Sequence, residues 1–198
     1  IDTMIGVIGT APGTDTVMTH TPGSHGGNMD CNKIVEGSTL YLPVNVPGAL
    51  LSMGDLHALM GDGEVMICGL ETGGEVTVTG GSFSENTAVL GGAIYNRFGK
   101  LTTNGVTFTK NSAVLDASEK NGNGGAVCLV GGTYTASDTD VFTENIAAGH
   151  GGAIYISYAA DDAGTTHYGA LTAGKTTFTG NSATTGGAVS IRTGCSAD

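Results

Sequence analysis

The chain has 198 residues, with 18 acidic and 7 basic side chains and a formal net charge of −11. Because this charge repels phosphate backbones and anionic membrane surfaces, we expect no nucleic-acid partner. The four cysteines are spread along the sequence without a CxxC pair, so neither a zinc knuckle nor a disulfide-dense scaffold is indicated. No apolar run approaches the roughly 20 residues that span a bilayer, so we expect no membrane span.

The amino-acid composition favours an all-β protein. Valine, isoleucine and threonine, which suit strands, are plentiful, whereas long polar helix formers such as lysine and arginine are scarce. Glycine contributes 35 residues and proline only 4, which indicates many tight turns and close backbone contacts rather than a collagen-like chain. The length allows one large domain or two small ones.

Residues 1–79 contain short apolar runs separated by turn residues, which predicts short strands and tight turns. Within this segment the stretch GDLHALMGDGE, residues 54–64, carries Asp55, His57, Asp62 and Glu64 among glycines and apolar residues. Asp55 and His57 are separated by one residue, so on a strand their side chains would lie on the same face, as joint metal ligation requires. The alternative is that these residues occupy a solvated loop, where aspartate and histidine commonly satisfy turns.

The run from Ile5 to Val78 resembles part of the acetamidase/formamidase family, whose motifs occur here in the same order as HGGNMD, GSTLYLPV, GALLSMGDLHALMGDGE and GLE. Members of that family are metal-dependent hydrolases of short linear amides. The resemblance therefore implies a segment of an amidase β-sandwich, a short linear amide as substrate, and a divalent metal ion, for which zinc is the expected choice. Zinc accepts aspartate and histidine ligands and lowers the pKa of a bound water to about 7.

The position of residues within these motifs implies their roles. Glu64 is the implied general base, and five residues are the implied metal ligands: Asp30, Asp55, His57, His25 and Glu71. Enzymes of this family have a substantial N-terminal region ahead of these motifs, and that region contributes further site residues. We therefore expect the amidase-like site in residues 1–79 to be incomplete in this chain.

From about residue 80 the sequence repeats a pair of short motifs. Phe-x-x-Asn occurs as FSEN, FTKN, FTEN and FTGN, and each copy is followed by a Gly-Gly-Ala motif, in GGAIY, GGAVC, GGAIY and GGAVS. The spacing from phenylalanine to Gly-Gly is eight or nine residues, except after Phe108, where an insertion around DASEKNGN extends it to sixteen. Such repeats are typical of coils that bury their apolar face only by stacking on one another.

These repeats predict a right-handed parallel β-helix over residues 80–198, preceded by the short-strand segment 1–79. In GVTFT, Val106 and Phe108 alternate with threonines, so a strand would point its apolar side chains inward and phenylalanines of successive coils would stack. Each asparagine would hydrogen-bond to a turn of the next coil, and each glycine pair would form a corner that a β-carbon would obstruct. We expect DASEKNGN and SYAADDAGTTHYG to be loops extruded from the coils.

The paired motifs resemble repeats of chlamydial polymorphic membrane proteins and of related β-helical surface or autotransporter passenger proteins. This resemblance gives a second hypothesis, a surface-exposed adhesive or structural module with no catalytic activity. In it, residues 1–79 cap the coil stack, and exposed β edges allow a protein partner or self-association. The adhesin hypothesis implies an extracellular or cell-surface protein, whereas the amidase hypothesis implies a cytoplasmic one.

A third hypothesis comes from four Thr-x-Thr pairs, which begin at Thr77, Thr107, Thr133 and Thr177. Threonines stacked on one flat face would order water and bind ice. Threonine is also simply a good exposed strand residue, which is the alternative explanation.

Overall fold

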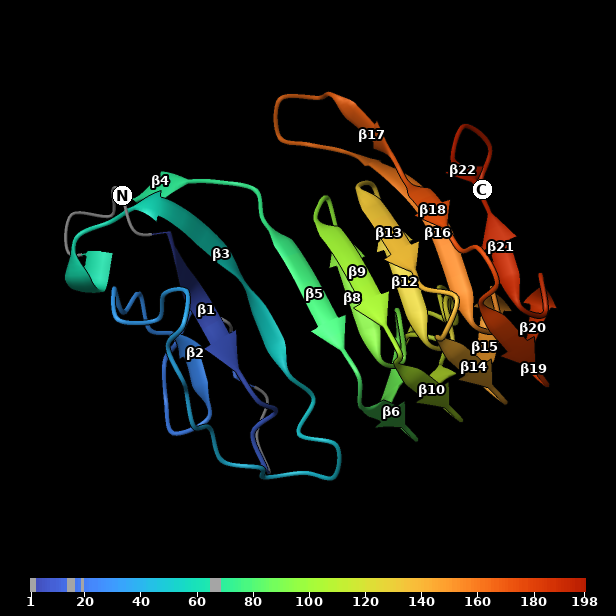
Figure 1. Ribbon diagram of the computed structural model, residues 1–198, viewed down its shortest axis with the longest axis horizontal. Helices are drawn as coiled ribbons and strands as arrows, with labels where there is room; N and C mark the ends of the chain where they lie inside the picture. The colour runs from blue at the N-terminus through green and yellow to red at the C-terminus, as the bar shows by residue number, and fades with distance from the viewer. Residues whose placement is uncertain (1–2, 14–16, 19, 65–68) are drawn as a thin grey trace. The chain divides into compact units, whose positions relative to one another are not determined.

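The computed structural model describes residues 3–13, 17–18, 20–64 and 69–198 (Figure 1). In these residues the regular structure consists of strands and one short 3₁₀ turn, Asp62–Glu64, so the expected all-β class is confirmed. The chain divides into two compact units, residues 1–74 (unit 1) and residues 75–198 (unit 2). The predicted domain boundary between residues 79 and 80 stays a prediction.

Unit 1 is built on a four-stranded sheet in the order β2-β1-β3-β4, in which neighbouring strands are antiparallel. The strands are β1 (Met4–Gly9), β2 (Gly26–Asn28), β3 (Ser52–Leu59) and β4 (Leu70–Glu71). Met4 lies opposite His57 at one end of β1, whereas Gly9 lies opposite Gly26 at the other end. Directly opposite residues share a face of the sheet, and both Met4 and His57 are buried. The pairing thus brings a histidine into the interior of unit 1.

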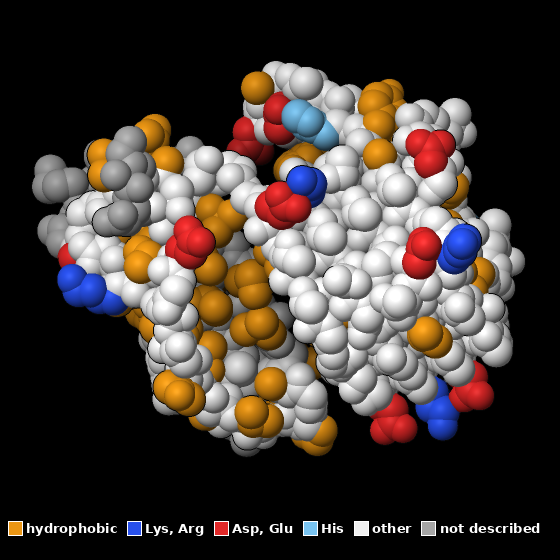
Figure 2. Space-filling model, in the orientation of Figure 1, with side chains coloured by type: hydrophobic (Ala, Val, Ile, Leu, Met, Phe, Trp, Pro, Cys, Tyr) orange, Lys and Arg blue, Asp and Glu red, His pale blue; other side chains and the backbone are white. Residues whose placement is uncertain are grey.

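Unit 1 also exposes many large apolar side chains, which Figure 2 shows gathered on its visible face at the left of the view. Each of these side chains is more than a third exposed: Val17, Met18, Leu40, Tyr41, Val44, Leu50, Leu51, Met53, Leu59 and Leu70. Contiguous exposed apolar surface of this kind is typical of interaction sites. The expected protein partner nevertheless stays a prediction.

The strands of unit 2 form four parallel sheets, and each sheet takes one strand from each successive repeat (Figure 1). The first sheet contains β6 (Ser82–Ser84), β10 (Thr107–Thr109), β14 (Val141–Thr143) and β19 (Thr177–Thr179). The second contains β7 (Thr87–Ala88), β11 (Ser112–Ala113), β15 (Ile146–His150) and β20 (Ser182–Thr185).

The other two sheets of unit 2 continue the same order. One contains β8 (Ile94–Arg97), β12 (Val127–Val130), β16 (Ile154–Ala160) and β21 (Val189–Ile191), with β17 (Thr166–Tyr168) added antiparallel to β16. The other contains β5 (Glu75–Thr79), β9 (Lys100–Asn104), β13 (Thr133–Ala136), β18 (Ala170–Thr172) and β22 (Ser196–Ala197). The chain visits the four sheets in a fixed rotation, but the right-handed sense of its winding stays a prediction.

The phenylalanines of the repeats stack in register, as the sequence predicted. Phe83, Phe108, Phe142 and Phe178 pair directly across the first sheet. Successive ring centroids are 5.2, 4.5 and 5.0 Å apart, and the rings lie within 16° of parallel. Phe108 and Phe142 are fully buried. The stack forms the centre of the apolar core of unit 2.

The asparagines of the same motifs form a hydrogen-bonded ladder. The side-chain amide of Asn111 donates to Asn145 Oδ1 at 2.9 Å and to the carbonyl of Phe83 at 2.9 Å, and Asn145 bonds in the same way to Asn181 and Phe108. Asn111 and Asn145 are completely buried, so these bonds satisfy amides that would otherwise be costly to desolvate. The ladder therefore fixes the register of successive repeats.

Glycine forms the corners of unit 2 that the sequence predicted. Gly91 has a φ of 59°, and a β-carbon on Gly125 would overlap the carbonyl oxygen of Gly152 in the next repeat. The close spacing of the repeats at this corner therefore excludes a side chain.

One expectation and one of the hypotheses for unit 2 are not supported by the structure. SYAADDAGTTHYG is not an irregular loop, because most of it forms the β16–β17 hairpin, whose turn closes where Asp161 Oδ1 accepts a hydrogen bond from the Thr165 N–H at 2.8 Å. The Thr-x-Thr pairs do not share one face. The pairs in β10 and β19 lie in one sheet and those in β5 and β13 in another, which removes the geometric basis for ice binding.

We predict that Phe108→Ala destabilises unit 2 by about 3–5 kcal/mol, because it removes a fully buried ring from the middle of the stack. Chemical denaturation followed by circular dichroism measures the change. Phe98→Ala is the matched control, since Phe98 is 38% exposed and lies outside the stack, and its loss should be clearly smaller. Equal losses for the two variants would contradict the assigned core.

Candidate metal centre

Three of the predicted metal ligands converge in unit 1. Asp30, Asp55 and His57 each offer a ligand atom, and these atoms lie within 4.8 Å of one another. His57 is fully buried, Asp30 is 7% exposed, and the Asp55 side chain is about one-third exposed. The group is thus reached from solvent on the side of Asp55.

The fold delivers these residues through β1, β3 and the segment after β2. Asp55 and His57 both lie on β3, while the N–H of Asp30 donates to the carbonyl of Gly6 on β1 at 3.1 Å. Gly6 leaves room for the carboxylates, because a β-carbon there would lie 2.6 Å from Asp30 Oδ1 and 2.9 Å from Asp55 Oδ2. Only glycine at this position of β1 allows both carboxylates to approach the strand.

Three acidic residues of the site hold unusual backbone conformations. The φ angles are 44° for Asp30, 56° for Asp55 and 44° for Glu64, in a region that residues with a β-carbon rarely adopt. Backbone strain of this kind persists only where the surrounding structure imposes it. The same conformation occurs at turns of unit 2, for example at Lys110 and Glu144, so it does not by itself mark a functional site. We infer that the convergence of these side chains is imposed by the fold of unit 1.

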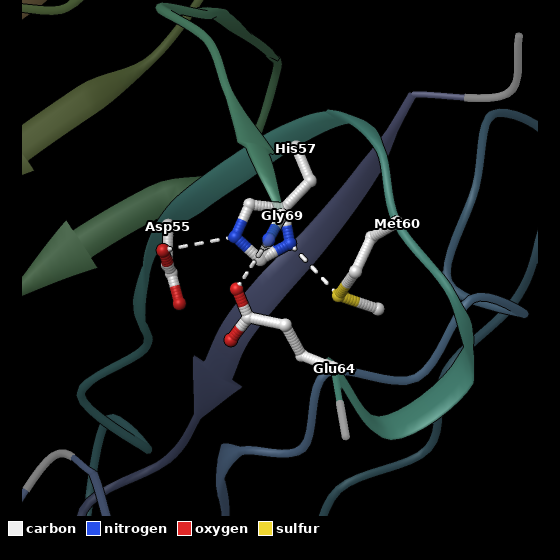
Figure 3. Close-up of polar contacts among 5 residues, drawn as sticks. All are labelled: Asp55, His57, Met60, Glu64 and Gly69. Carbon is white, nitrogen blue, oxygen red and sulfur yellow. Dashed lines mark hydrogen bonds and ion pairs between the residues drawn. The ribbon is translucent and has the colours of Figure 1, made fainter. Parts of the chain in front are cut away.

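His57 is held on both sides of its ring (Figure 3). Its Nε2 lies 3.3 Å from Asp55 Oδ1, and its Nδ1 lies 3.0 Å from Met60 Sδ. The ring therefore has one nitrogen directed at the carboxylate group and the other at a thioether.

Glu64 lies beside this group, at the end of the 3₁₀ turn. Its Oε1 accepts a hydrogen bond from the Gly69 N–H at 2.7 Å (Figure 3). A β-carbon on Gly69 would lie 2.9 Å from Glu64 Oε1 and 3.0 Å from His57 Nε2, so Glu64 and His57 approach the same point of the chain. The turn is tied to the site because the Gly63 N–H donates to the carbonyl of Asp30 at 2.8 Å.

The electrostatics of the site favour a cation. Among the described residues, Asp30 Oδ1 is a buried oxygen without a hydrogen-bond partner. Burial, together with the negative charges of Asp55 and Glu64, raises the pKa of Asp30, while His57 and a hydrogen bond from Asn28 act in the opposite direction. A positive charge placed among these oxygens would remove both penalties.

Of the other two predicted ligands, His25 lies outside this group, and the side chain of Glu71 is not among those that the structure describes. His25 precedes β2, and its carbonyl accepts a hydrogen bond from the Thr10 N–H at 2.9 Å, beyond the end of β1 that is remote from His57. There it lines a small, mostly apolar cavity of about 150 Å³ with Val7, Met18 and Leu50. Glu71 lies opposite His57 in the β3–β4 pairing, but its side chain is outside the described part of the structure. The ligand roles of both residues stay predictions.

Sequence reasoning missed Gly6, Gly69 and Met60. The two glycines give no signal by themselves, because glycine is frequent throughout the chain. Met60 lies three residues after His57, at a position that is easily interpreted as filling the core. Its proximity to a candidate ligand was the available signal.

Residues 3–82 match the model of the acetamidase/formamidase family, which confirms the resemblance for this segment. A formamidase of Methylophilus methylotrophus is 52% identical over 48 residues, which cover 24% of this chain and 12% of that protein. An acetamidase of Mycolicibacterium smegmatis is 48% identical over 61 residues, which cover 30% of this chain and 15% of that protein. The chain thus spans 12–15% of the length of these relatives.

Among solved structures, an acetamidase from Bacillus halodurans is similar, with 61% sequence identity and a TM-score of 0.35 over 35% of this chain and 24% of that one. In unit 2, residues 80–97, 105–129, 141–157 and 175–192 match the repeat of Chlamydia polymorphic membrane proteins. Within the described residues, no helix is both long and apolar enough to cross a bilayer.

We predict that Asp30→Asn makes the metal-free protein more stable at neutral pH. Because the pKa of Asp30 is raised on folding, the folded protein holds this proton more tightly than the unfolded chain. Stability is therefore lost as the pH rises from the ordinary value of 3.8 through the raised one. Asparagine has no proton to lose, so it avoids this penalty. Thermal melts in excess chelator should show a higher Tm for the variant at pH 7, and the difference should shrink toward pH 4.

Asp161→Asn is the control for this experiment. The pKa of Asp161 is lowered, chiefly by its hydrogen bond to His167, so its charged form stabilises the fold and its replacement should not raise the Tm at pH 7. A metal-free Asp30→Asn variant that melts below the wild type at pH 7 would show that Asp30 is not a destabilising buried acid.

Proposed function

We propose that unit 1 is the metal-binding part of a site that hydrolyses short linear amides, and that Asp30, Asp55 and His57 hold its divalent metal ion. The observation that carries the proposal is the convergence of two carboxylates and an imidazole around Asp30 Oδ1, which is buried and has no hydrogen-bond partner among the described residues. The similarity of residues 3–82 to the acetamidase/formamidase family supports the amide as substrate class.

The donor set is compatible with zinc, which accepts histidine nitrogen and carboxylate oxygen. Catalytic zinc sites use three protein ligands drawn from histidine nitrogen and carboxylate oxygen, and they keep one position open. Two aspartates and one histidine meet that requirement, and the partial exposure of Asp55 gives a small substrate access. A bound zinc ion would supply Lewis acidity and a water of lowered pKa.

Glu64 is proposed as the general base. Its Oε1 is fixed by the Gly69 N–H, which orients the carboxylate beside His57. From there Glu64 Oε2 would accept a proton from the attacking water and return it to the leaving nitrogen, so that the amide and water become a carboxylic acid and ammonia. Asp30, Asp55 and His57 would hold the metal ion and do not exchange protons in this scheme.

The site is proposed to be incomplete in unit 1 alone. The chain spans 12–15% of the length of these curated relatives. Glu71, which lies opposite His57 in the β3–β4 pairing, is retained as a proposed further ligand, whereas the position of His25 at the other end of β1 does not support a ligand role for it. The exposed apolar side chains of unit 1 offer a surface on which further protein could complete the site.

For unit 2 we propose a right-handed parallel β-helix. The fixed rotation of the chain through four parallel sheets and the in-register stack of phenylalanines support this architecture. Its role is proposed to be structural, and the adhesive module remains the alternative function of the chain. An electron-density map that shows left-handed winding would contradict the proposal.

We predict that purified protein retains about one zinc ion per chain, and that it releases ammonia from formamide or acetamide when further protein completes the site. His57→Ala should reduce the zinc content to background, because it removes the buried nitrogen ligand. Glu64→Gln should keep the zinc and lower turnover by about 10²–10⁴-fold, the usual contribution of a general base. Elemental analysis and an ammonia assay measure the two quantities.

His167→Ala is the matched control, since His167 also pairs with an aspartate, Asp161, at 2.8 Å but on the surface of unit 2 and outside the three-residue group. It should retain the zinc. Zinc without turnover by the chain alone is the result expected of an incomplete site, whereas the absence of both zinc and turnover would leave only the non-catalytic alternative.

A further inference from the structure

We propose that Met60 is a positioning residue that selects which nitrogen of His57 binds the metal. The inference rests on the proposed function and assigns a role to a residue outside the predicted ligand set. The Met60 thioether accepts a hydrogen bond from Nδ1 and thereby presents Nε2 to the position between Asp30 and Asp55.

The chemistry of the two atoms sets the direction of this hydrogen bond. Met60 Sδ lies 3.0 Å from His57 Nδ1, and a thioether sulfur accepts hydrogen bonds but has no proton to donate. The contact therefore needs the proton on Nδ1. In the neutral ring, Nε2 then carries the lone pair, and it is Nε2 that lies 3.3 Å from Asp55 Oδ1 (Figure 3). A lone pair and a carboxylate oxygen that face each other at this distance are suited to a shared cation.

The loop after β3 is built to hold Met60 in place. Met60 follows β3 directly and is half-buried, and Gly63 in the same loop is hydrogen-bonded to the carbonyl of Asp30. Glu64 is fixed in turn by the Gly69 N–H. One short loop thus carries both the proposed base and the acceptor that orients the proposed histidine ligand.

A neutral hydrogen-bond acceptor suits His57 Nδ1 better than a negatively charged carboxylate would. Metal-binding histidines commonly donate their second N–H to a carboxylate or a carbonyl. Here Asp30, Asp55 and Glu64 already place three carboxylates near the ring, and the negative charges of Asp55 and Glu64 raise the pKa of Asp30. A thioether fixes the tautomer without adding a further negative charge.

The first test measures zinc affinity with a competing chelator. Met60→Leu keeps the size of the side chain and removes the acceptor, and it should weaken zinc binding about 10–100-fold, the range found for partners of metal-binding histidines. Met60→Gln, whose amide oxygen can accept from Nδ1, should recover most of the loss. Met53→Leu is the matched control, because Met53 is an exposed methionine on β3, the strand that precedes Met60, and it should bind zinc like the wild type. Circular dichroism melts of the metal-free variants check that each one folds.

The second test reads the tautomer directly by long-range ¹H–¹⁵N correlation of the His57 ring. The wild type should show a proton on His57 Nδ1 both without metal and with zinc bound. In Met60→Leu, this Nδ1 proton should no longer be protected from exchange with solvent. A wild type that binds zinc no better than Met60→Leu, or that carries no proton on Nδ1, would overturn the inference. A wild type that binds no zinc but keeps the protected Nδ1 proton would instead overturn the proposed metal site and restrict Met60 to orienting the ring.

Discussion

Two carboxylates and an imidazole meet in a largely buried part of unit 1, and the stability and chemistry of this group depend on what balances the negative charge. Asp30 and Asp55 approach β1 only because residue 6 is glycine, and Asp30 Oδ1 lies buried without a hydrogen-bond partner among the described residues. Such an arrangement costs free energy unless a proton or a metal ion lies between the oxygens. The positive φ angles of Asp30 and Asp55 add to this cost. Because this arrangement lowers the stability of unit 1, ligand binding explains it better than a contribution to folding does.

Unit 2 was the more predictable half, because its period is visible in the sequence. Each Phe-x-x-Asn motif places one ring in the core and one amide in the ladder, so Phe108 and Asn145 have the neighbours that the spacing predicts. The insertion after β16 was harder to predict, because its strand residues form a hairpin through local pairing of Tyr158 with Tyr168 and not through the repeat. The threonine pairs misled for a related reason, since a short motif does not specify which of four sheets it joins.

The candidate site was predictable only in part. The alternation of strand residues was enough to pair Asp55 with His57, whereas Asp30 came from family resemblance, since nothing in its local sequence indicates that it reaches β3. His25 belongs to the same HGGNMD motif, but the antiparallel pairing of β1 with β2 carries it beyond the opposite end of β1. Met60 was missed because the geometry that directs its sulfur at His57 Nδ1 arises from the loop, which is tied to Asp30 by a backbone hydrogen bond. Long-range pairing of this kind is not encoded in any short motif.

X-ray absorption at the zinc edge, on protein loaded with one equivalent of zinc, shows whether zinc binds at His57. Zinc held by Asp30, Asp55 and His57 should have nitrogen and oxygen neighbours at about 2.0–2.2 Å and the outer-shell scattering of a single imidazole. That scattering should disappear in His57→Ala and persist in His167→Ala. A first shell of oxygen atoms alone, or an imidazole signal unchanged in His57→Ala, would show that zinc binds elsewhere on the protein.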